Sequence, residues 1–167
     1  ASDARYLIVT VNSPSLQCLI VVGHSPHSRE GDAKANAWYD NLSTLISRYR
    51  TDRPVILLID SNATMGSETS AMVGDYMAER PNKVSEPFHQ LLQTAAIALP
   101  ATFEEHQHGV SATWHHTSGA EERIDFVGVS HEWLPAVRCA WVVLDVDIST
   151  RRDDHFVVAV ELRFSKG

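Results

Sequence analysis

The chain has 167 residues, of which 44% are hydrophobic and 21% charged, a composition that suits one globular domain with a buried core. Its formal net charge of −7 argues against a passive nucleic-acid-binding module, which should be basic, but not against an enzyme whose bound cations offset clustered carboxylates. No apolar run approaches the ~20 residues of a membrane span, and the N-terminus lacks the layout of a signal peptide.

The first third of the chain predicts a hairpin, a helix and a buried strand. Residues 6–11 and 16–22 are apolar and β-branched, and turn-forming residues separate them. A polar loop opens at His24. Apolar residues recur at helical spacing over 33–50, and 55–59 is apolar throughout, which predicts a helix followed by a buried central strand.

The rest of the chain predicts further helices and strands. We expect helices over 68–79 and 85–98, then a loop over 100–119 with short strands at 102–103 and 112–114. Three more strands are expected over 123–129, 137–146 and 155–164. Cys18 and Cys139 lie in apolar, strand-like segments and are expected to be buried free thiols. The pattern predicts a layered α/β domain.

Polar residues lie at the ends of several predicted strands. They are His24, Asp60 with Asn62, Asp125, and Asp154 with His155. Strands that end at one sheet edge can bring distant residues into one site. Carboxylates can hold a divalent cation that neutralises phosphate charge, and a His–Asp pair can transfer a proton, so these residue types suit phosphodiester cleavage.

Each of these groups also has a purely structural interpretation. Asp60-Ser61-Asn62 could form an Asx turn or a helix cap, and Asp154-His155 a polar turn. Asp125 could be a salt-bridged strand residue, and His24 a loop histidine bonded to backbone. Composition alone does not decide between the two interpretations.

The order and context of the groups carry a resemblance. The chain reads Val-Val-Gly-His24-Ser-Pro-His, Ile-Leu-Leu-Ile-Asp60-Ser-Asn62-Ala, Arg-Ile-Asp125-Phe-Val and Arg-Asp-Asp154-His155-Phe-Val-Val. This series resembles the second half of the endonuclease/exonuclease/phosphatase superfamily, which has the DNase I-like fold. Trp114, before Arg-Ile-Asp, and Trp133, after it, are most similar to the endonuclease domains of non-LTR retrotransposons.

The resemblance implies that residues 1–167 are the C-terminal part of a single domain, a four-layered α/β-sandwich whose N-terminal half is missing. It implies a Mg²⁺- or Mn²⁺-dependent phosphodiesterase, an endonuclease that hydrolyses DNA. Asp60 and Asn62 would bind the phosphate or position the attacking water and would also contact the metal, for which Asp154 is the further ligand. His155 would contact the scissile phosphate, oriented by Asp125, and His24 would be a second histidine on the phosphate side.

The chain also departs from the family pattern. Ile59 stands where a glycine is usual, Ser61 where a bulky residue is usual, and Asp153 where a serine is usual. The family's first half, which supplies an asparagine and the metal-anchoring glutamate, has no counterpart here. A half-sandwich should expose an apolar sheet face, which we expect the missing half or another protein to cover. The isolated chain should therefore bind Mg²⁺ weakly and have little or no activity.

Other functions stay open at this point. A domesticated, catalytically silent module that serves as a structural subunit would explain the missing half and the acidic charge. A phosphatase acting on soluble phosphoesters is another possibility within the same superfamily. The histidines at 106, 108, 115 and 116 match no closed zinc pattern and are interpreted as a solvated loop.

Overall fold

The computed structural model describes residues 5–116, 118–146 and 155–164. Strands β1 (Tyr6–Asn12) and β2 (Gln17–His24) form the predicted hairpin, with Tyr6 opposite Gly23 and Asn12 opposite Gln17. The turn between them is closed by Ser13, whose backbone N–H donates to the Leu16 carbonyl at 3.0 Å and whose Oγ accepts from the Leu16 N–H at 3.0 Å.

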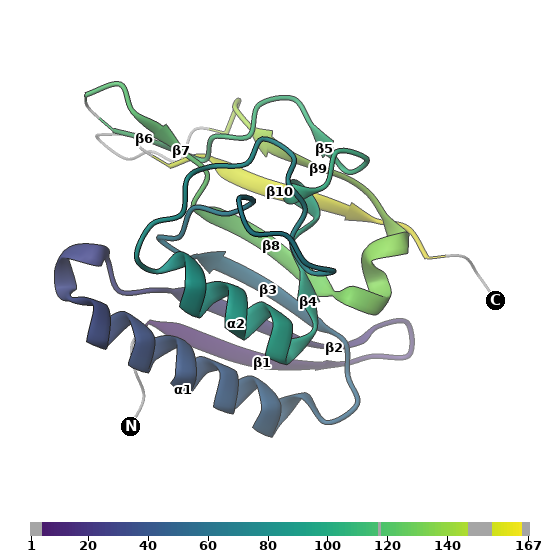
Figure 1. Ribbon diagram of the computed structural model, residues 1–167. Coiled ribbons are helices and arrows are strands. Elements are labelled where there is room, and N and C mark those ends of the chain that lie inside the picture. The colour runs from purple at the N-terminus through teal and green to yellow at the C-terminus, as the bar shows by residue number, and fades with distance from the viewer. Residues whose placement is uncertain (1–4, 117, 147–154, 165–167) are drawn as a thin grey trace.

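The main sheet has five strands in the order β1-β2-β3-β8-β4 (Figure 1). Strand β3 (Val55–Asp60) is its central strand, as predicted, and pairs in parallel with β2 and antiparallel with β8 (Asp125–Ser130). The two-residue strand β4 (Ile97–Ala98) completes the sheet beside β8.

Two α-helices cover one face of this sheet (Figure 1). Helix α1 (Asp32–Arg50) follows the short 3-10 helix η1 (Ser28–Glu30), and α2 (Ser85–Ala95) packs beside α1. A row of aromatic rings joins the layers: Trp38, Tyr39, Phe88 and Phe126, with successive centroids 5.1, 5.6 and 5.9 Å apart. The hydrophobic core of the chain therefore lies between α1, α2 and the main sheet.

A smaller sheet has the order β10-β9-β5, from Val157–Leu162, Val137–Val143 and Gln107–His108. It lies against β8: Val127 of β8 and Val158 and Val160 of β10 line one internal cavity of about 10 Å³. Strands β6 (Trp114–His115) and β7 (Glu121–Glu122) form a separate short hairpin, and η2 (Pro100–Thr102) and η3 (His131–Ala136) are 3-10 helices. The α/β fold class predicted from the sequence is confirmed.

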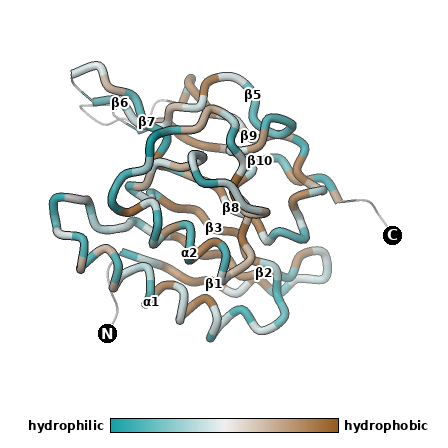
Figure 2. Tube along the Cα trace, viewed as in Figure 1, coloured by the Kyte–Doolittle hydropathy of each residue, from teal (hydrophilic) through white to brown (hydrophobic). Residues whose placement is uncertain are grey.

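The face of β1, β2 and β3 opposite the helices stays open to solvent. We call this surface the outer face. By register, Leu7, Val22 and Leu58 form one row across it, and Val9, Ile20 and Ile56 form the next. Leu7 is 59% exposed and Leu58 38%, although both lie in strands that Figure 2 draws as hydrophobic. The small sheet covers only the β8 side, so β3 is buried on one face instead of both.

Two predicted elements were wrong. Residues 68–79 form turns instead of a helix, because Ser70 hydrogen-bonds its own turn and the Tyr76 N–H bonds the carbonyl of Thr102. A side chain at Gly74 would meet that carbonyl at 2.3 Å, so this close approach requires glycine. Thr102 and Phe103 do not form a strand, because Pro100 begins the 3-10 helix η2 and the Phe103 N–H donates to the Pro100 carbonyl.

Burial varies among the aromatic and cysteine side chains. Phe126 is fully buried, whereas Trp114 and Phe156 are half-buried, because their hairpin and strand lie at the margin of the fold. Both cysteines are free thiols, but only Cys18 is buried. Within the described part of the chain, no helix is long and apolar enough to cross a membrane.

Candidate active site

Three polar residues form one row across the main sheet. In the register of β2, β3 and β8, His24 lies beside Asp60, and Asp60 lies beside Asp125. The row continues the outer face, because His24 and Asp60 lie two residues after Val22 and Leu58, and Asp125 lies two residues before Val127 on the antiparallel strand β8. His24 Nε2 lies 3.5 Å from Asp60 Oδ2. The sheet therefore holds a histidine and two carboxylates at one end of its outer face.

His155 completes this group from the segment that enters β10. Its Nδ1 lies 2.9 Å from Asp125 Oδ2, and the two side chains are 35% and 16% exposed. A β-bridge joins His155 to Trp114, whose ring centroid lies 6.5 Å from the imidazole. The hydrogen bond to a carboxylate and the neighbouring indole together fix the orientation of the imidazole.

Asn62 is held next to the row by a tight turn. Its backbone has φ 50°, in the left-handed region that asparagine tolerates, and its N–H donates to Asp60 Oδ1 at 3.1 Å. Its side-chain Nδ2 donates to the Ser25 carbonyl at 3.1 Å. The Asn62 carbonyl accepts from Asn82 Nδ2 at 2.9 Å. The Asx turn considered from the sequence is therefore present, and it also fixes the Asn62 amide beside Asp60.

A cleft of about 540 Å³ lies over these residues. Its lining comprises His24, His27, Arg29, Asp60, Asn62, Asn82, Trp114, Glu122, Ile124 and His155. Of the residues in this lining that sequence reasoning did not select, His27 and Arg29 follow His24 in the same polar loop, so their position in the sequence could have identified them. Asn82 carries no such signal, because the fold brings it to the cleft from a distant segment, where it bonds Asn62 and Ser85.

Asp60 has a perturbed ionisation. Burial raises the pKa of the Asp60 carboxyl, and the neighbouring charge of Asp125 raises it further. The Asn62 N–H, His155 and His24 oppose this rise by stabilising the carboxylate. Two carboxylates held together at one site favour either a proton or a bound cation.

Asp60, Asp125 and His155 form a candidate metal site. Each offers one ligand atom, and these atoms lie within 4.8 Å of one another. Two carboxylates suit a hard divalent cation, and the raised pKa of Asp60 indicates excess negative charge that a cation would offset. Asn62 is next to this set, and its Nδ2 bonds Ser25, which leaves the amide oxygen as its possible ligand atom. Asp154, the further ligand expected from the sequence, lies outside the described residues.

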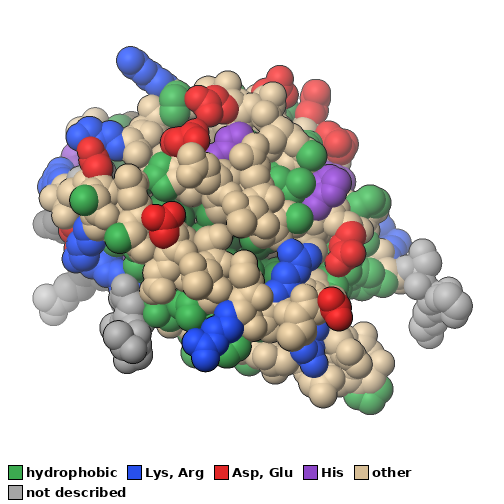
Figure 3. All heavy atoms as spheres, turned by 60° about the horizontal axis from the view of Figure 1, so that its bottom comes forward, with side chains coloured by type: hydrophobic (Ala, Val, Ile, Leu, Met, Phe, Trp, Pro, Cys, Tyr) green, Lys and Arg blue, Asp and Glu red, His purple; other side chains and the backbone are tan. Residues whose placement is uncertain are grey.

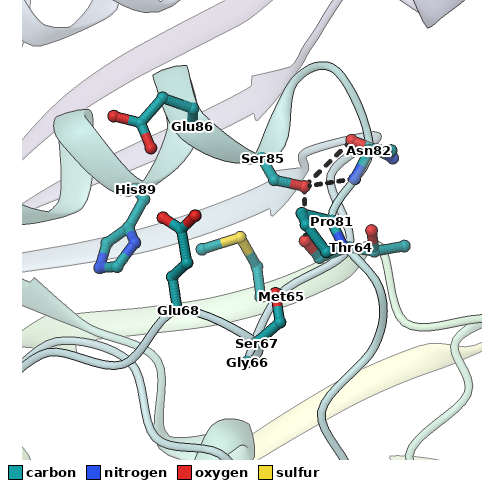
Figure 4. A pocket seen from close by; sticks show the side chains of 10 residues that line it. All are labelled: Thr64, Met65, Gly66, Ser67, Glu68, Pro81, Asn82, Ser85, Glu86 and His89. Carbon is teal, nitrogen blue, oxygen red and sulfur yellow. Dashed lines mark hydrogen bonds between the residues drawn. The ribbon is translucent and has the colours of Figure 1, made fainter.

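A smaller pocket of about 60 Å³ lies beside the cleft, and Asn82 lines both. In Figure 4, Glu68, Glu86 and His89 lie on one side of it and Ser85 and Asn82 on the other. Ser85 Oγ donates to the Thr64 carbonyl at 2.7 Å, and the Asn82 N–H donates to Ser85 Oγ at 2.9 Å. These bonds fix Asn82, and through it the turn at Asn62.

Charged side chains are dispersed over the surface. On the face in Figure 3, the Lys and Arg side chains of the described residues do not gather into one basic patch. Lys34 and Arg5 both bind Glu30, and Lys83 binds Asp32. This dispersion agrees with the net charge of −7.

No protein-family model and no curated protein sequence matches this chain. Solved structures do match it. A 3′-5′ exonuclease from Neisseria meningitidis is 19% identical with a TM-score of 0.70, over 96% of this chain and 65% of that one. The endonuclease domain of TRAS1, a telomere-specific non-LTR retrotransposon, is 13% identical with a TM-score of 0.67, over 97% and 65%.

A mannosyl-6-phosphatase from Bacteroides thetaiotaomicron is also similar, at 20% identity and a TM-score of 0.55, over 90% of this chain and 53% of that one. The chain thus spans at most 65% of the length of these structures. At such identities the likeness shows the fold. This chain has the fold of these structures, the DNase I-like fold that its four motifs predicted.

Proposed function

We propose that this chain is part of a divalent-cation-dependent phosphodiesterase whose substrate is DNA. The observation that carries the proposal is the convergence of Asp60, Asp125 and His155, from β3, β8 and the segment before β10, to within 4.8 Å. Separately these residues have ordinary structural interpretations. Together, beside His24 and an open cleft, they supply a carboxylate for a cation, that of Asp60, and a His155–Asp125 pair for proton transfer.

Each side chain has a defined part in the proposed reaction. Asp60 and Asn62 hold the attacking water or a phosphate oxygen, because both line the cleft and are fixed to each other. Asp125 orients His155 and stabilises its protonated form, so that His155 can stabilise charge on the phosphate. His24 binds the phosphate from the other side of Asp60. Mg²⁺ or Mn²⁺ at Asp60, Asn62 and Asp154 would neutralise phosphate charge and activate a water.

DNA is proposed as the substrate in preference to a small phosphoester. One similar protein, from Neisseria, is described as a 3′-5′ exonuclease and, in a second structure bound to a product DNA hairpin, as a 3′ phosphatase; another is a retrotransposon endonuclease. The cleft is open and carries an indole, Trp114, on which a base can stack. A phosphatase acting on soluble phosphoesters remains the alternative within this fold, since a sugar phosphatase is also similar.

We also propose that residues 1–167 are the C-terminal part of one domain whose other part covers the outer face. Four apolar side chains of the outer face are each 38% exposed or more: Leu7, Val9, Val22 and Leu58. Together they form a continuous apolar surface beside the row of His24, Asp60 and Asp125. An apolar-faced sheet, from further polypeptide or a partner chain, is the complementary structure. It would also bring the glutamate that the first half of this fold supplies to the metal.

A structural, catalytically silent module is the second candidate. The same outer face favours it, because a surface that needs a partner also suits a subunit of a larger assembly. The two candidates differ in one respect: only the enzyme requires Asp60, Asp125 and His155 to act on a bound phosphate.

The test is hydrolysis of a diester, bis(p-nitrophenyl) phosphate, a monoester, p-nitrophenyl phosphate, and supercoiled plasmid, each with Mg²⁺ or Mn²⁺ and with chelator. The chain is assayed alone and joined to a first half of this fold, with Asp60→Ala and His155→Ala in parallel. The proposal predicts chelator-sensitive cleavage of diester and plasmid that both substitutions abolish. Preferential cleavage of the monoester would assign a phosphatase, and inactivity of every form would favour the silent module.

A further inference from the structure

The residue between Asp60 and Asn62 departs from the family pattern and is completely buried. Ser61 is 0% exposed, and its side chain and both backbone polar groups are hydrogen-bonded. Its N–H and its Oγ both donate to the Ile124 carbonyl, at 2.8 and 2.7 Å. Its Oγ also accepts from the Ala63 N–H at 3.1 Å. A bulky apolar side chain could make neither of the Oγ contacts.

The carbonyl of Ser61 receives two further donors. Tyr39 Oη of α1 donates to it at 2.6 Å, and Ser25 Oγ donates to it at 2.6 Å. Ser25 and Tyr39 are 0% and 1% exposed, so these bonds are shielded from water. Burial raises the pKa of Tyr39, which keeps its hydroxyl a neutral donor.

Ser61 and two of its partners are adjacent in sequence to the three members of the row, His24, Asp60 and Asp125. Ser25 follows His24, Ser61 follows Asp60, and Ile124 precedes Asp125. A backbone hydrogen bond also joins the segments that carry His24 and Asp60, since the Ser25 N–H donates to the Asp60 carbonyl at 2.9 Å. Each strand that carries a member of the row is therefore tied to Ser61 at the adjacent residue. α1 supplies the remaining tie through Tyr39, whose ring packs against Phe88.

From this arrangement we propose that Ser61, with Tyr39 and Ser25, is a positioning residue that fixes the separations of His24, Asp60 and Asp125. The proposal rests on the proposed function in one respect only, namely that Asp60, a member of the row, binds a divalent cation. Residues behind the ligands of a metal site set the ligand geometry, and their loss typically weakens metal binding about 10–100-fold. A site with few protein ligands depends strongly on such geometry.

Another buried serine provides a matched control. Ser130 is 0% exposed and lies at the opposite end of β8, where its Oγ accepts from the Val55 N–H at 2.6 Å. It ties β3 to β8 as Ser61 does, but far from the row. Loss of either hydroxyl should destabilise the fold to a similar degree, since it leaves buried polar groups without a partner. Only loss of Ser61 should alter the site.

The experiment compares three variants of the full chain. The first is Ser61→Ala, the second is the double variant that combines Tyr39→Phe with Ser25→Ala, and the third is Ser130→Ala. Mn²⁺ affinity is measured by EPR of the free ion, at a temperature where circular dichroism shows each variant folded. The His155 imidazole nitrogens are followed by long-range ¹⁵N–¹H NMR without metal. We expect about 10-fold weaker Mn²⁺ binding and shifted His155 nitrogens in the first two variants, and neither change in Ser130→Ala.

Equal effects of Ser61→Ala and Ser130→Ala on both readouts, or no effect of Ser61→Ala, would overturn the proposal. If Ser61→Ala does not fold, the double variant Tyr39→Phe with Ser25→Ala, in which the phenylalanine retains the ring packing, decides by the same two readouts. If the unmodified chain binds no Mn²⁺, the metal role fails, whereas the His155 spectrum still tests whether Ser61 positions the row.

Discussion

Asp60 lies directly opposite Asp125 in the antiparallel pair of β3 and β8, so two carboxylates lie beside each other on adjacent strands at the end of the main sheet. Burial and Asp125 together raise the pKa of Asp60. The folded chain therefore binds this proton more tightly than the unfolded chain does. With no cation bound, ionised Asp60 lowers the stability of the fold, and this cost grows as the pH rises from 3.8 through the raised pKa.

Asp60→Asn should consequently raise the melting temperature at pH 7 in the presence of a chelator. The amide oxygen can still accept from the Asn62 N–H, and the repulsion from Asp125 is removed. The gain should shrink as the pH falls toward 3.8, where Asp60 is increasingly protonated in both states. Calorimetry across this range, with exposed Asp52→Asn as the control, measures it. A lower melting temperature at pH 7 would show that Asp60 stabilises the fold as a carboxylate.

Asp125→Asn should reduce turnover while leaving the fold intact. The 2.9 Å contact with His155 Nδ1 orients the imidazole and stabilises its charged form, and an amide supplies no charge. In the assembly that is active, kcat should fall about 100-fold or more, and KM should change little. Glu122→Gln, which changes a carboxylate that lines the cleft, is the control. Equal losses in both variants would remove the special role of the His155–Asp125 pair.

Arg29→Ala should weaken substrate binding. Arg29 lines the cleft near His24 and His27, and the adjacent Glu30 is engaged by Arg5 and Lys34. One charge-assisted contact to a phosphate should be reflected in a KM roughly 10-fold higher, with kcat nearly unchanged. The difference should shrink in high salt. Arg48→Ala, on the exposed surface of α1, is the matched control, and equal increases in KM would refute a local role for Arg29.

The outer face should make the isolated chain self-associate or bind a hydrophobic dye. Leu7→Lys with Leu58→Lys should reduce both effects, because the charges interrupt the apolar row. Exposed Tyr49→Lys on α1 is the control. Sedimentation and dye fluorescence measure the change. An unmodified chain that is monomeric and binds no dye would contradict a surface built to be covered.

The sequence predicted those parts of the fold and site that local patterns specify. The strand at 55–59 ends directly before Asp60, and the motif order placed Asp125 and His155 on later strands of the same fold. The absence of a helix at 68–79 could not be predicted, because it depends on the contact between Gly74 and Thr102, which are distant in the chain. The same is true of Asn82, which the fold brings beside Asn62 from a segment 20 residues further along the chain.

Ser61 illustrates the same limit at the site itself. In the sequence it is one departure from a family motif, and nothing near it identifies a partner. Its importance follows from Tyr39, Ser25 and Ile124, which the fold brings to it from α1, β2 and the start of β8. Buried polar networks of this kind depend on long-range contacts that strand patterns do not encode.

The central claim is that Asp60, Asp125 and His155 form the phosphodiesterase site of a protein completed by further polypeptide. The most direct measurement is nicking of supercoiled plasmid in Mg²⁺, comparing this chain alone with the same chain joined to a first half of this fold. We expect little nicking by the chain alone, because the cation has few protein ligands, and chelator-sensitive nicking by the completed protein that Asp60→Ala and His155→Ala abolish. Nicking by the completed protein that survives both substitutions would contradict the account.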